Sequence, residues 1–206
     1  TNSIRTYAGN GVEDVKDGSL AKCCLAQPSG LATDGKYLFV VDSEGSSLRA
    51  VTLPPGNRVG TLVGTTGLPM FKSLFAFGDR DGVGSAVRLQ HPIGVAFADG
   101  KIYVADTYNH RIRQISPAGL VTTVAGSGVA TFADGKGKAA AFYYPADVAV
   151  GPGGKLYVAD RVNHRIRIIA KDGQVSTLAG GSGGFANAQG SKARFSNPYG
   201  LAVTPG

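Results

Sequence analysis

The sequence predicts an all-β fold, a β-propeller of four-stranded blades, and three observations support this prediction. First, prolines 92, 145 and 198 begin copies of one repeat and lie 53 residues apart. Second, 31 glycines and 10 prolines separate short apolar runs in a chain of 206 residues, which is typical of strands joined by tight turns. Third, no segment shows the apolar period of a helix. A repeat that cannot cover both faces of its own sheet favours stacked blades over a two-sheet sandwich or an open barrel.

Each copy of the repeat reads as four strands in a fixed order. An apolar strand follows the first proline, and a glycine turn leads to a second strand that ends in Asp, as in Tyr-Val-Ala-Asp. An Asn-His corner reverses the chain into Arg-Ile-Arg, and another glycine turn leads to a closing strand that ends in Ala-Gly. The prolines that open the copies are Pro28, Pro92, Pro145 and Pro198.

Residues 101–113 and 155–167 are nearly identical, and both contain the corner, at Asn109-His110 and Asn163-His164. These segments resemble the NHL repeat family, with Arg where the family name has Leu. Residues 4–115, through Phe-Gly-Asp-Arg-Asp-Gly-Val-Gly and the Leu-Gln-His-Pro after it, resemble the propeller of the thioredoxin-like/NHL proteins of the NHL repeat-containing protein 2 type. The resemblance implies a β-propeller that usually has six blades. The family includes binding modules and a few lyase-like enzymes.

The whole chain, 1–206, is expected to form a single NHL-type propeller region. Complete blades are predicted at about 28–64, 92–126 and 145–180, with a lone closing strand in the partial blade 1–9 and a lone opening strand in the partial blade 198–206. A six-bladed ring would need roughly 300 residues, so we expect an incomplete propeller or a fragment of a ring. Exposed blade edges would then allow self-association.

The composition limits the partners. The formal net charge of +7 allows a polyanionic partner, and no apolar run approaches the ~18–20 residues of a membrane span, so no membrane partner is expected. Cys23 and Cys24 are adjacent and form neither a disulfide framework nor a zinc site. They are interpreted as buried thiols, with a redox pair as the alternative.

Repeated polar residues are interpreted as structural. Residues that recur once per blade lie around the ring, so Asp42, Asp106 and Asp160 are expected to cap the turn that follows each of them. His110 and His164 are expected to form hydrogen bonds between blades. Just after the blade prolines, Asp147 stands where the other copies have glycine, and one carboxylate is too few for calcium. The sequence therefore predicts no catalytic residue, no metal and no cofactor.

The remaining candidate is a binding face. Loops 65–90, 127–144 and 181–196 are expected to emerge on the same face as the corners. The first loop is the longest and rich in aromatic residues, and it either packs on the rim or anchors a partner. The candidate binding residues are Phe75, Phe77, Arg80, Tyr108, Asn109, His110, Arg161, Asn163 and His164.

The leading hypothesis is a non-catalytic protein-interaction scaffold within a larger multidomain protein. The alternative is single-stranded RNA binding through a basic loop face, on which Arg111, Arg113, Arg165 and Arg167 recur two per blade. These arginines would otherwise pair with carboxylates of neighbouring blades. A second alternative is a metal-dependent hydrolase or lyase of the six-bladed class, which requires bound calcium or zinc.

Overall fold

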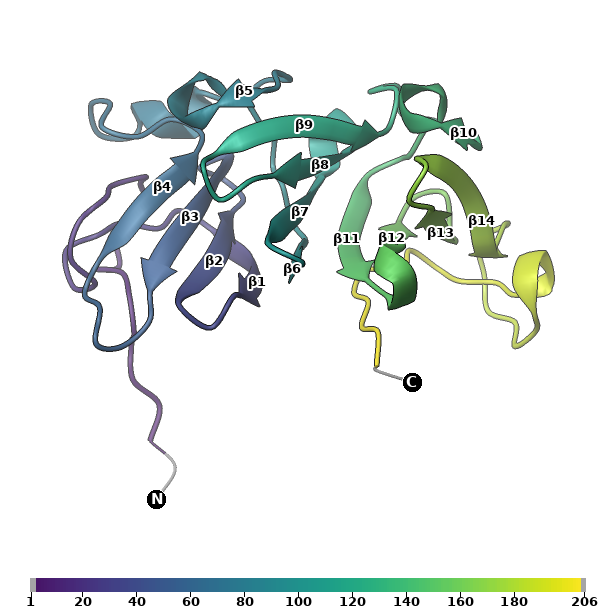
Figure 1. The fold of residues 1–206 in the computed structure, drawn as a ribbon, viewed down its shortest axis with the longest axis horizontal. Coiled ribbons are helices and arrows are strands. Elements are labelled where there is room, and N and C mark those ends of the chain that lie inside the picture. The colour runs from purple at the N-terminus through teal and green to yellow at the C-terminus, as the bar shows by residue number, and fades with distance from the viewer. Residues whose placement is uncertain (1–2, 205–206) are drawn as a thin grey trace.

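The computed structural model describes residues 3–204 and consists of three antiparallel sheets that follow one another in an arc (Figure 1). This confirms the all-β propeller prediction. Besides strands, the described residues form short 3₁₀ helices and no α-helix. None of these helices is long and apolar enough to cross a membrane. Each sheet is one blade, and the blades are numbered in chain order.

The four main strands of each blade pair in sequence order, and blades 2 and 3 each have a fifth strand at the outer edge. Blade 1 contains β1 (Pro28–Thr33), β2 (Tyr37–Asp42), β3 (Ser47–Thr52) and β4 (Val59–Val63). Blade 2 contains β6 (Val95–Ala98), β7 (Lys101–Asp106), β8 (Arg111–Ile115) and β9 (Leu120–Ala125), and β5 (Gly82–Val83) pairs with the outer edge of β9. Blade 3 contains β11 (Pro145–Val150), β12 (Leu156–Asp160), β13 (Arg165–Ile169) and β14 (Gln174–Gly180), and β10 (Gly135–Lys136) pairs with β14.

The 3₁₀ turns mark the connections. They are η1 (Lys72–Phe75), η2 (Gly84–Ala86), η3 (Thr107–Asn109), η4 (Gly137–Ala139), η5 (Pro152–Gly154) and η6 (Gly190–Lys192). The loops before blades 2 and 3 were expected to be binding loops over their whole length. Part of each loop instead forms the fifth, outermost strand of the blade that follows. Strands of two residues are too short to show an alternating pattern in the sequence.

The apolar core lies between the blades, because each sheet buries side chains on its flanks. One cluster joins blades 1 and 2 and includes Phe39, Leu48 and Ile102. Another joins blades 2 and 3 and includes Ile112 and Phe142. Each fully buried side chain of this size stabilises the fold by about 1.5–3 kcal/mol. The blades are thus held together by the surfaces that a single sheet leaves uncovered.

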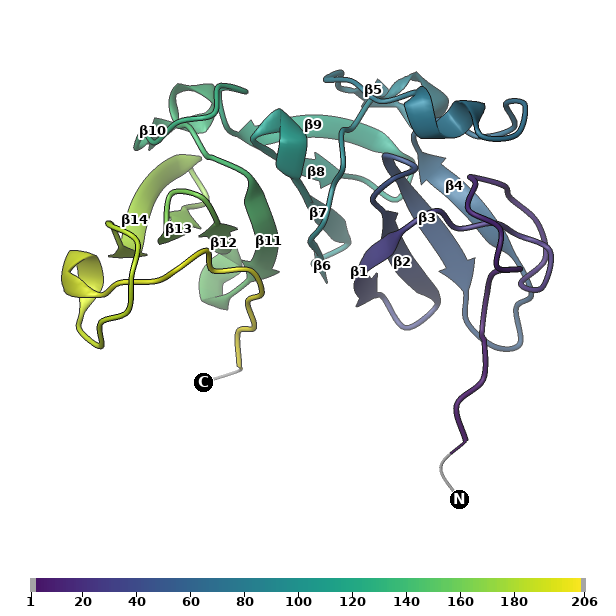
Figure 2. The same cartoon turned by 180° about the vertical axis from the view of Figure 1, so that it is seen from behind.

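The first strands of neighbouring blades meet on the inner side of the arc, and glycine permits their close approach. A Cβ atom at Gly30 would lie 2.4 Å from the carbonyl oxygen of Ile93, and one at Gly94 would lie 2.4 Å from a carboxylate oxygen of Asp147. Figure 2 shows the segment after η6 returning to this inner side beside β11. Gly30 and Gly94 are therefore required for the close packing of the first strands.

The two lone strands expected at the chain ends are not formed in the described residues. Ile4–Gly9 and Asn197–Thr204 contain no strand, and the side chain of Ile4 is fully exposed. A lone strand with no neighbouring strand cannot form ladder hydrogen bonds, so the backbone groups of these segments that are bonded have partners outside any strand ladder. The N–H of Gly9, for example, donates to the carbonyl of Leu20. Parts of both expected segments, residues 1–2 and 205–206, lie outside the described residues.

Candidate protein-binding face

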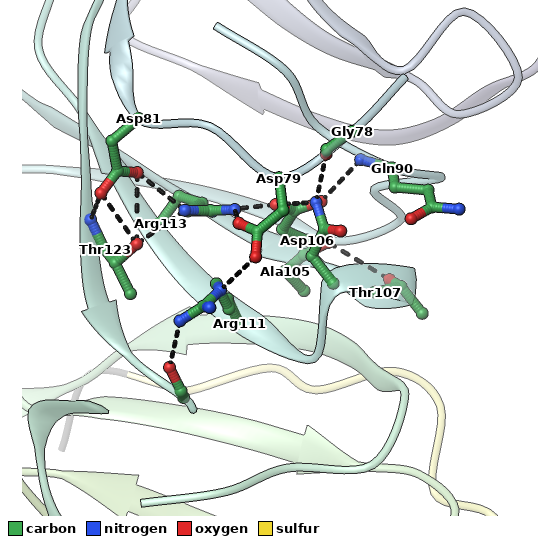
Figure 3. Close-up of polar contacts among 12 residues, drawn as sticks. Gly78, Asp79, Asp81, Gln90, Ala105, Asp106, Thr107, Arg111, Arg113 and Thr123 are labelled. Atoms are coloured by element: carbon green, nitrogen blue, oxygen red, sulfur yellow. Dashed lines mark hydrogen bonds and ion pairs between the residues drawn. The ribbon is translucent and has the colours of Figure 1, made fainter. Parts of the chain in front are cut away.

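The repeated aspartate ends the second strand of each blade and is fully buried. In blade 2, one carboxylate oxygen of Asp106 accepts the N–H of Gln90 at 2.9 Å, and the other accepts Asn109 Nδ2 at 2.9 Å and Arg113 Nε at 2.8 Å (Figure 3). The expectation that this residue caps the following turn through backbone N–H groups is wrong. The backbone donor comes from the segment before the blade, and the corner contributes a side-chain amide.

The same arrangement recurs in the other blades. Asp160 accepts the N–H of Tyr143 at 2.8 Å and the side chains of Asn163 and Arg167 at 2.9 and 2.8 Å. Asp42 accepts two backbone N–H groups at 2.8 Å and Arg49 at 3.1 Å. Each aspartate therefore joins the start of its blade to the third strand, and in blades 2 and 3 it also binds the corner asparagine.

One arginine of each third strand completes this buried cluster: Arg49 in blade 1, Arg113 in blade 2 and Arg167 in blade 3. Arg113 also binds Asp79 and Asp81, whereas Arg167 binds Asp134 at 2.6 Å and Arg49 binds Asp17 at 2.9 Å. The expected partners were carboxylates of neighbouring blades. The actual partners are the blade's own repeated aspartate and a carboxylate in the segment before that blade.

A sequence signal for this second carboxylate exists and was missed. Asp17, Asp81 and Asp134 each stand eleven residues before a blade proline. Residue 187, at the same distance before Pro198, is Asn.

Burial controls the electrostatics of the blade 2 cluster. Desolvation raises the pKa of Asp106 to about 6, although Arg113, Asn109 and the N–H of Gln90 all favour the carboxylate. Burial alone would lower the pKa of Arg113, but the Asp106, Asp79 and Asp81 carboxylates raise it above its ordinary value. The guanidinium therefore stays charged inside the blade, and its positive charge reduces the free-energy cost of burying the Asp106 carboxylate.

The corner histidines form hydrogen bonds between blades. His110 Nδ1 accepts the N–H of Tyr144 at 3.1 Å, and His164 Nδ1 accepts the N–H of Asn197 at 3.2 Å. In blade 1 the corresponding acceptor is Ser46 Oγ, which takes the N–H of His91 at 3.3 Å. All six backbones at these contacts are left-handed, with φ between 42° and 54°. Burial lowers the pKa of His110, which favours the neutral ring that this contact needs.

Beside these contacts, a row of aromatic rings runs from the insertion before blade 2, past the blade 2 corner, to Tyr144 before blade 3. His91 stacks on Tyr108 with ring centroids 4.6 Å apart, and Phe77 lies 6.3 Å from His91 on the other side. Tyr108 contacts Tyr144 at 5.0 Å, and Tyr144 contacts His110 at 4.8 Å. The rings of Phe77 and Tyr108 remain 45% and 46% exposed. The row therefore offers aromatic surface to a partner.

The insertion 65–80 lies at the end of this row and does not bury its apolar side chains. Phe75 is 74% exposed and Met70 is 64% exposed, and Leu68, Phe71 and Phe77 are exposed as well. The expectation that the insertion packs on the rim is therefore wrong for these side chains. Asn109 Nδ2 donates to the carbonyl of Gly78 at 2.6 Å, which fixes the end of the insertion against the blade 2 corner. We call the insertion 65–80 and the corners 43–46, 107–110 and 161–164 the corner face.

The structure brings some predicted site residues together and leaves others apart. Phe77, Tyr108, Asn109 and His110 lie in or beside the aromatic row, and Phe75 lies in the insertion. Arg80 is exposed outside the row, and its Nε donates to the carbonyl of Ala86 at 2.6 Å.

Three predicted residues belong to blade 3. Arg161 lies over the ring of Tyr199 at 5.5 Å, Asn163 Nδ2 donates to Thr131 at 3.0 Å, and His164 contacts Asn197. Sequence reasoning missed the position of His91, whose Nε2 pairs with Glu44 at 3.1 Å.

No metal-binding group of three or more His, Cys, Asp or Glu occurs within residues 3–204. Asp147 accepts the N–H groups of Val148 and Leu201, each at 2.8 Å, and burial raises its pKa. Asp147 thus connects the first strand of blade 3 to the segment near Leu201. Cys23 and Cys24 are both buried and free.

These features define the chain as an arc of β-propeller blades in which the same strand order repeats from blade to blade. The NHL repeat family matches residues 89–115 and 142–169, which lie in blades 2 and 3. The chain therefore contains NHL repeats, and the resemblance inferred from its corners is confirmed.

The sequence similarity of the chain to known proteins supports the same family. The chain is 45% identical over 184 residues to the chloroplastic protein SUPPRESSOR OF QUENCHING 1 of Arabidopsis thaliana, which covers 84% of this chain and 17% of that protein. It is 43% identical over 173 residues to NHL repeat-containing protein 2 of Bos taurus, which covers 79% of this chain and 23% of that protein. The chain thus spans less than a quarter of either relative. A Bacteroides thetaiotaomicron protein of unknown function shares the fold, with a TM-score of 0.51 and 18% identity over 95% of this chain and 69% of that chain.

Proposed function

We propose that this chain is a non-catalytic protein-interaction scaffold that binds its partner through the corner face. The observation that carries the proposal is the insertion 65–80, which leaves five large apolar side chains exposed beside an aromatic row. A soluble protein rarely exposes clustered apolar side chains unless they form an interface. Aromatic residues held by a rigid support are also the usual anchors of protein interfaces.

The hydrogen bonds of the buried carboxylates also support the proposal. The buried carboxylates of the repeats are occupied by arginine side chains and backbone N–H groups, as in the cluster around Asp106. They are therefore not free for acid–base or metal chemistry. In this proposal the NHL repeats supply a rigid frame, and the insertion 65–80 supplies the contact surface.

The charge of the corner face favours an acidic partner. Its carboxylates Glu44 and Asp79 are already paired with His91 and with arginines of blade 2. Lys72 and Arg161, in contrast, have no ion pair within the described residues. Complementary charge would steer an acidic protein toward this face and set its orientation.

The test is capture of binding proteins from a lysate of the cells that express the protein. Alanine substitutions at Phe75, Phe77, Tyr108 and Arg161 together should reduce the recovery of specific partners at least tenfold while the thermal unfolding profile stays cooperative. Phe75→Ala alone should also reduce recovery, and its exposed side chain makes a folding defect improbable as the cause. Unchanged recovery with both variants would contradict the proposal.

A matched control uses exposed apolar residues away from the corner face. Val83 and Leu120 are 57% and 48% exposed and pair with one another across β5 and β9 at the outer edge of blade 2. Val83→Ala with Leu120→Ala should leave recovery unchanged. Equal losses in the control and the test variants would indicate nonspecific hydrophobic capture.

Single-stranded RNA binding is the second candidate, because exposed cations occur on the loops between blades. They are Lys136, Lys138, Lys192 and Arg194. The arginines first considered for this role are less suited, since Arg113 and Arg167 are buried in ion pairs. RNA binding predicts that the affinity for a 20-nucleotide oligouridylate falls steeply as salt rises. Absent or salt-insensitive binding would reject this candidate.

A further inference from the structure

A groove lies between blades 2 and 3 on the side of the arc opposite the corner face. Its volume is about 380 Å³, and its apolar lining includes Leu156 and Ile169. Asp99 and Lys171 also line it, and they belong to the turns after β6 and β13. These turns lie at the other ends of the strands from the corners. The volume falls within the range of small-molecule pockets, roughly 300–1,000 Å³.

The corresponding space between blades 1 and 2 is filled by large apolar side chains. The residues that fill it are Tyr37, Phe39, Leu62 and Phe97. Within this set, the rings of Phe39 and Phe97 stack with centroids 5.6 Å apart. At the equivalent strand positions, the interface of blades 2 and 3 has Lys101, Tyr103, Val124 and Val150. Three of the four filling residues are replaced by a charged or smaller side chain, Lys101, Val124 and Val150, and this difference between two copies of one interface accounts for the groove.

Five polar side chains line the groove without a protein partner. They are Asp99, Lys101, Tyr103, Gln114 and Lys171. None of them forms a side-chain hydrogen bond or ion pair within residues 3–204, whereas the repeated polar residues of the blades are all engaged. The lining contains two lysines and one aspartate, so the groove carries a net positive charge. Burial and the Asp99 charge raise the pKa of Tyr103, which keeps its hydroxyl a hydrogen-bond donor.

We propose that this groove binds a small organic anion with an apolar body. The apolar body would contact Val124 and Ala170, which also line the groove and are only partly buried, and the anionic group would lie between the Lys101 and Lys171 side chains. The Tyr103 hydroxyl and the Gln114 amide add neutral donors beside them. A few polar groups above an apolar floor are the usual composition of a ligand site. This site is independent of the corner face, so the failure of either proposal leaves the other standing.

The test uses decanoate as the probe and NMR titration as the measurement. Decanoate should cause saturable shifts centred on Tyr103, Gln114 and Ile169, and decyltrimethylammonium, which has the same chain and the opposite charge, should bind at least tenfold more weakly. Lys171→Gln should weaken decanoate binding about fivefold, because one of two ammonium groups is lost. No saturable decanoate binding, or equal binding of the cation, would overturn the proposal.

A second variant, which fills the groove with larger side chains, tests the site without removing packing from the fold. Lys101→Tyr with Val124→Leu installs the residues that blade 1 has at these positions, so the fold already accommodates them. This variant should lose decanoate affinity at least tenfold. Lys155→Tyr, the equivalent exposed change in blade 3, should keep its affinity within twofold. If the filling variant binds decanoate as the unaltered chain does, the groove is not the site.

Discussion

Replacing Arg113 with methionine tests whether the buried ion cluster stabilises blade 2 and the segment that leads into it. Arg113 binds three carboxylates and the Thr123 hydroxyl, and its side chain is only 2% exposed. Two of those carboxylates, Asp79 and Asp81, are 39% and 34% exposed, so water would compensate for much of their loss. Asp106 is fully buried and would be left as an uncompensated charge. Removing one partner of such a pair costs about 3–5 kcal/mol.

The pH dependence of this loss has a definite sign. The pKa of Asp106 is about 6 in the fold against an ordinary value of 3.8, so its protonated form is favoured in the native state. Stability from this group is fully present below pH 3.8 and is lost as the pH rises through about 6. Arg113 offsets only the charged form of Asp106. The deficit of Arg113→Met should therefore be larger at pH 8 than at pH 5.

Urea unfolding followed by circular dichroism would measure these differences. Asp106→Asn alone and combined with Arg113→Met completes a double-mutant cycle. The two losses should be non-additive by at least about 2 kcal/mol, because either change removes the same interaction. A loss below about 1 kcal/mol for Arg113→Met at pH 8, or additive losses in the cycle, would refute the reasoning.

Three further outcomes follow from the geometry. His110→Asn keeps an acceptor for the Tyr144 N–H in a left-handed backbone that Asn tolerates. The pKa of His110 is lowered below 6.5 in the fold, so protonation of this residue destabilises the unaltered chain at low pH. The variant should therefore lose less stability than the unaltered chain as the pH falls below 6.5. Gly126→Ala should cost at least about 2 kcal/mol in urea unfolding, since φ is +109° and the new Cβ would lie 2.4 Å from the His110 carbonyl oxygen, whereas Gly100→Ala, with φ +71° and open space, should cost only about 1 kcal/mol. Cys23 is fully buried and burial raises its pKa, so iodoacetamide should label it at pH 8 only after unfolding; rapid labelling of the native chain would contradict its placement.

The sequence was sufficient to predict the blades because the repeat preserves each residue's neighbours. Tyr103 pairs with Ala96 and Gln114, and Tyr157 pairs with the equivalent Ala149 and Ile168. Equivalent residues therefore occupy equivalent places in different blades. A fixed period with matching turns carries this information directly, without any knowledge of the packing.

Contacts that cross between copies were harder to predict. The aromatic row joins Phe77, His91, Tyr108 and Tyr144, which are far apart in the sequence and do not recur as a set. Their contact depends on the angle at which one blade packs on the next, and no local pattern encodes that angle. Likewise, the exposure of the insertion 65–80 could not be read from its apolar composition, which fits packing and partner binding equally well.

The most direct test of the binding account is hydrogen–deuterium exchange of the chain with and without its captured partner. The partner to use is a protein that the unaltered chain recovers and the Phe75→Ala variant does not. The account predicts new protection of backbone amides at residues 65–80 and 107–110. Protection confined to the opposite turns, at residues 99–101 and 170–173, would contradict it.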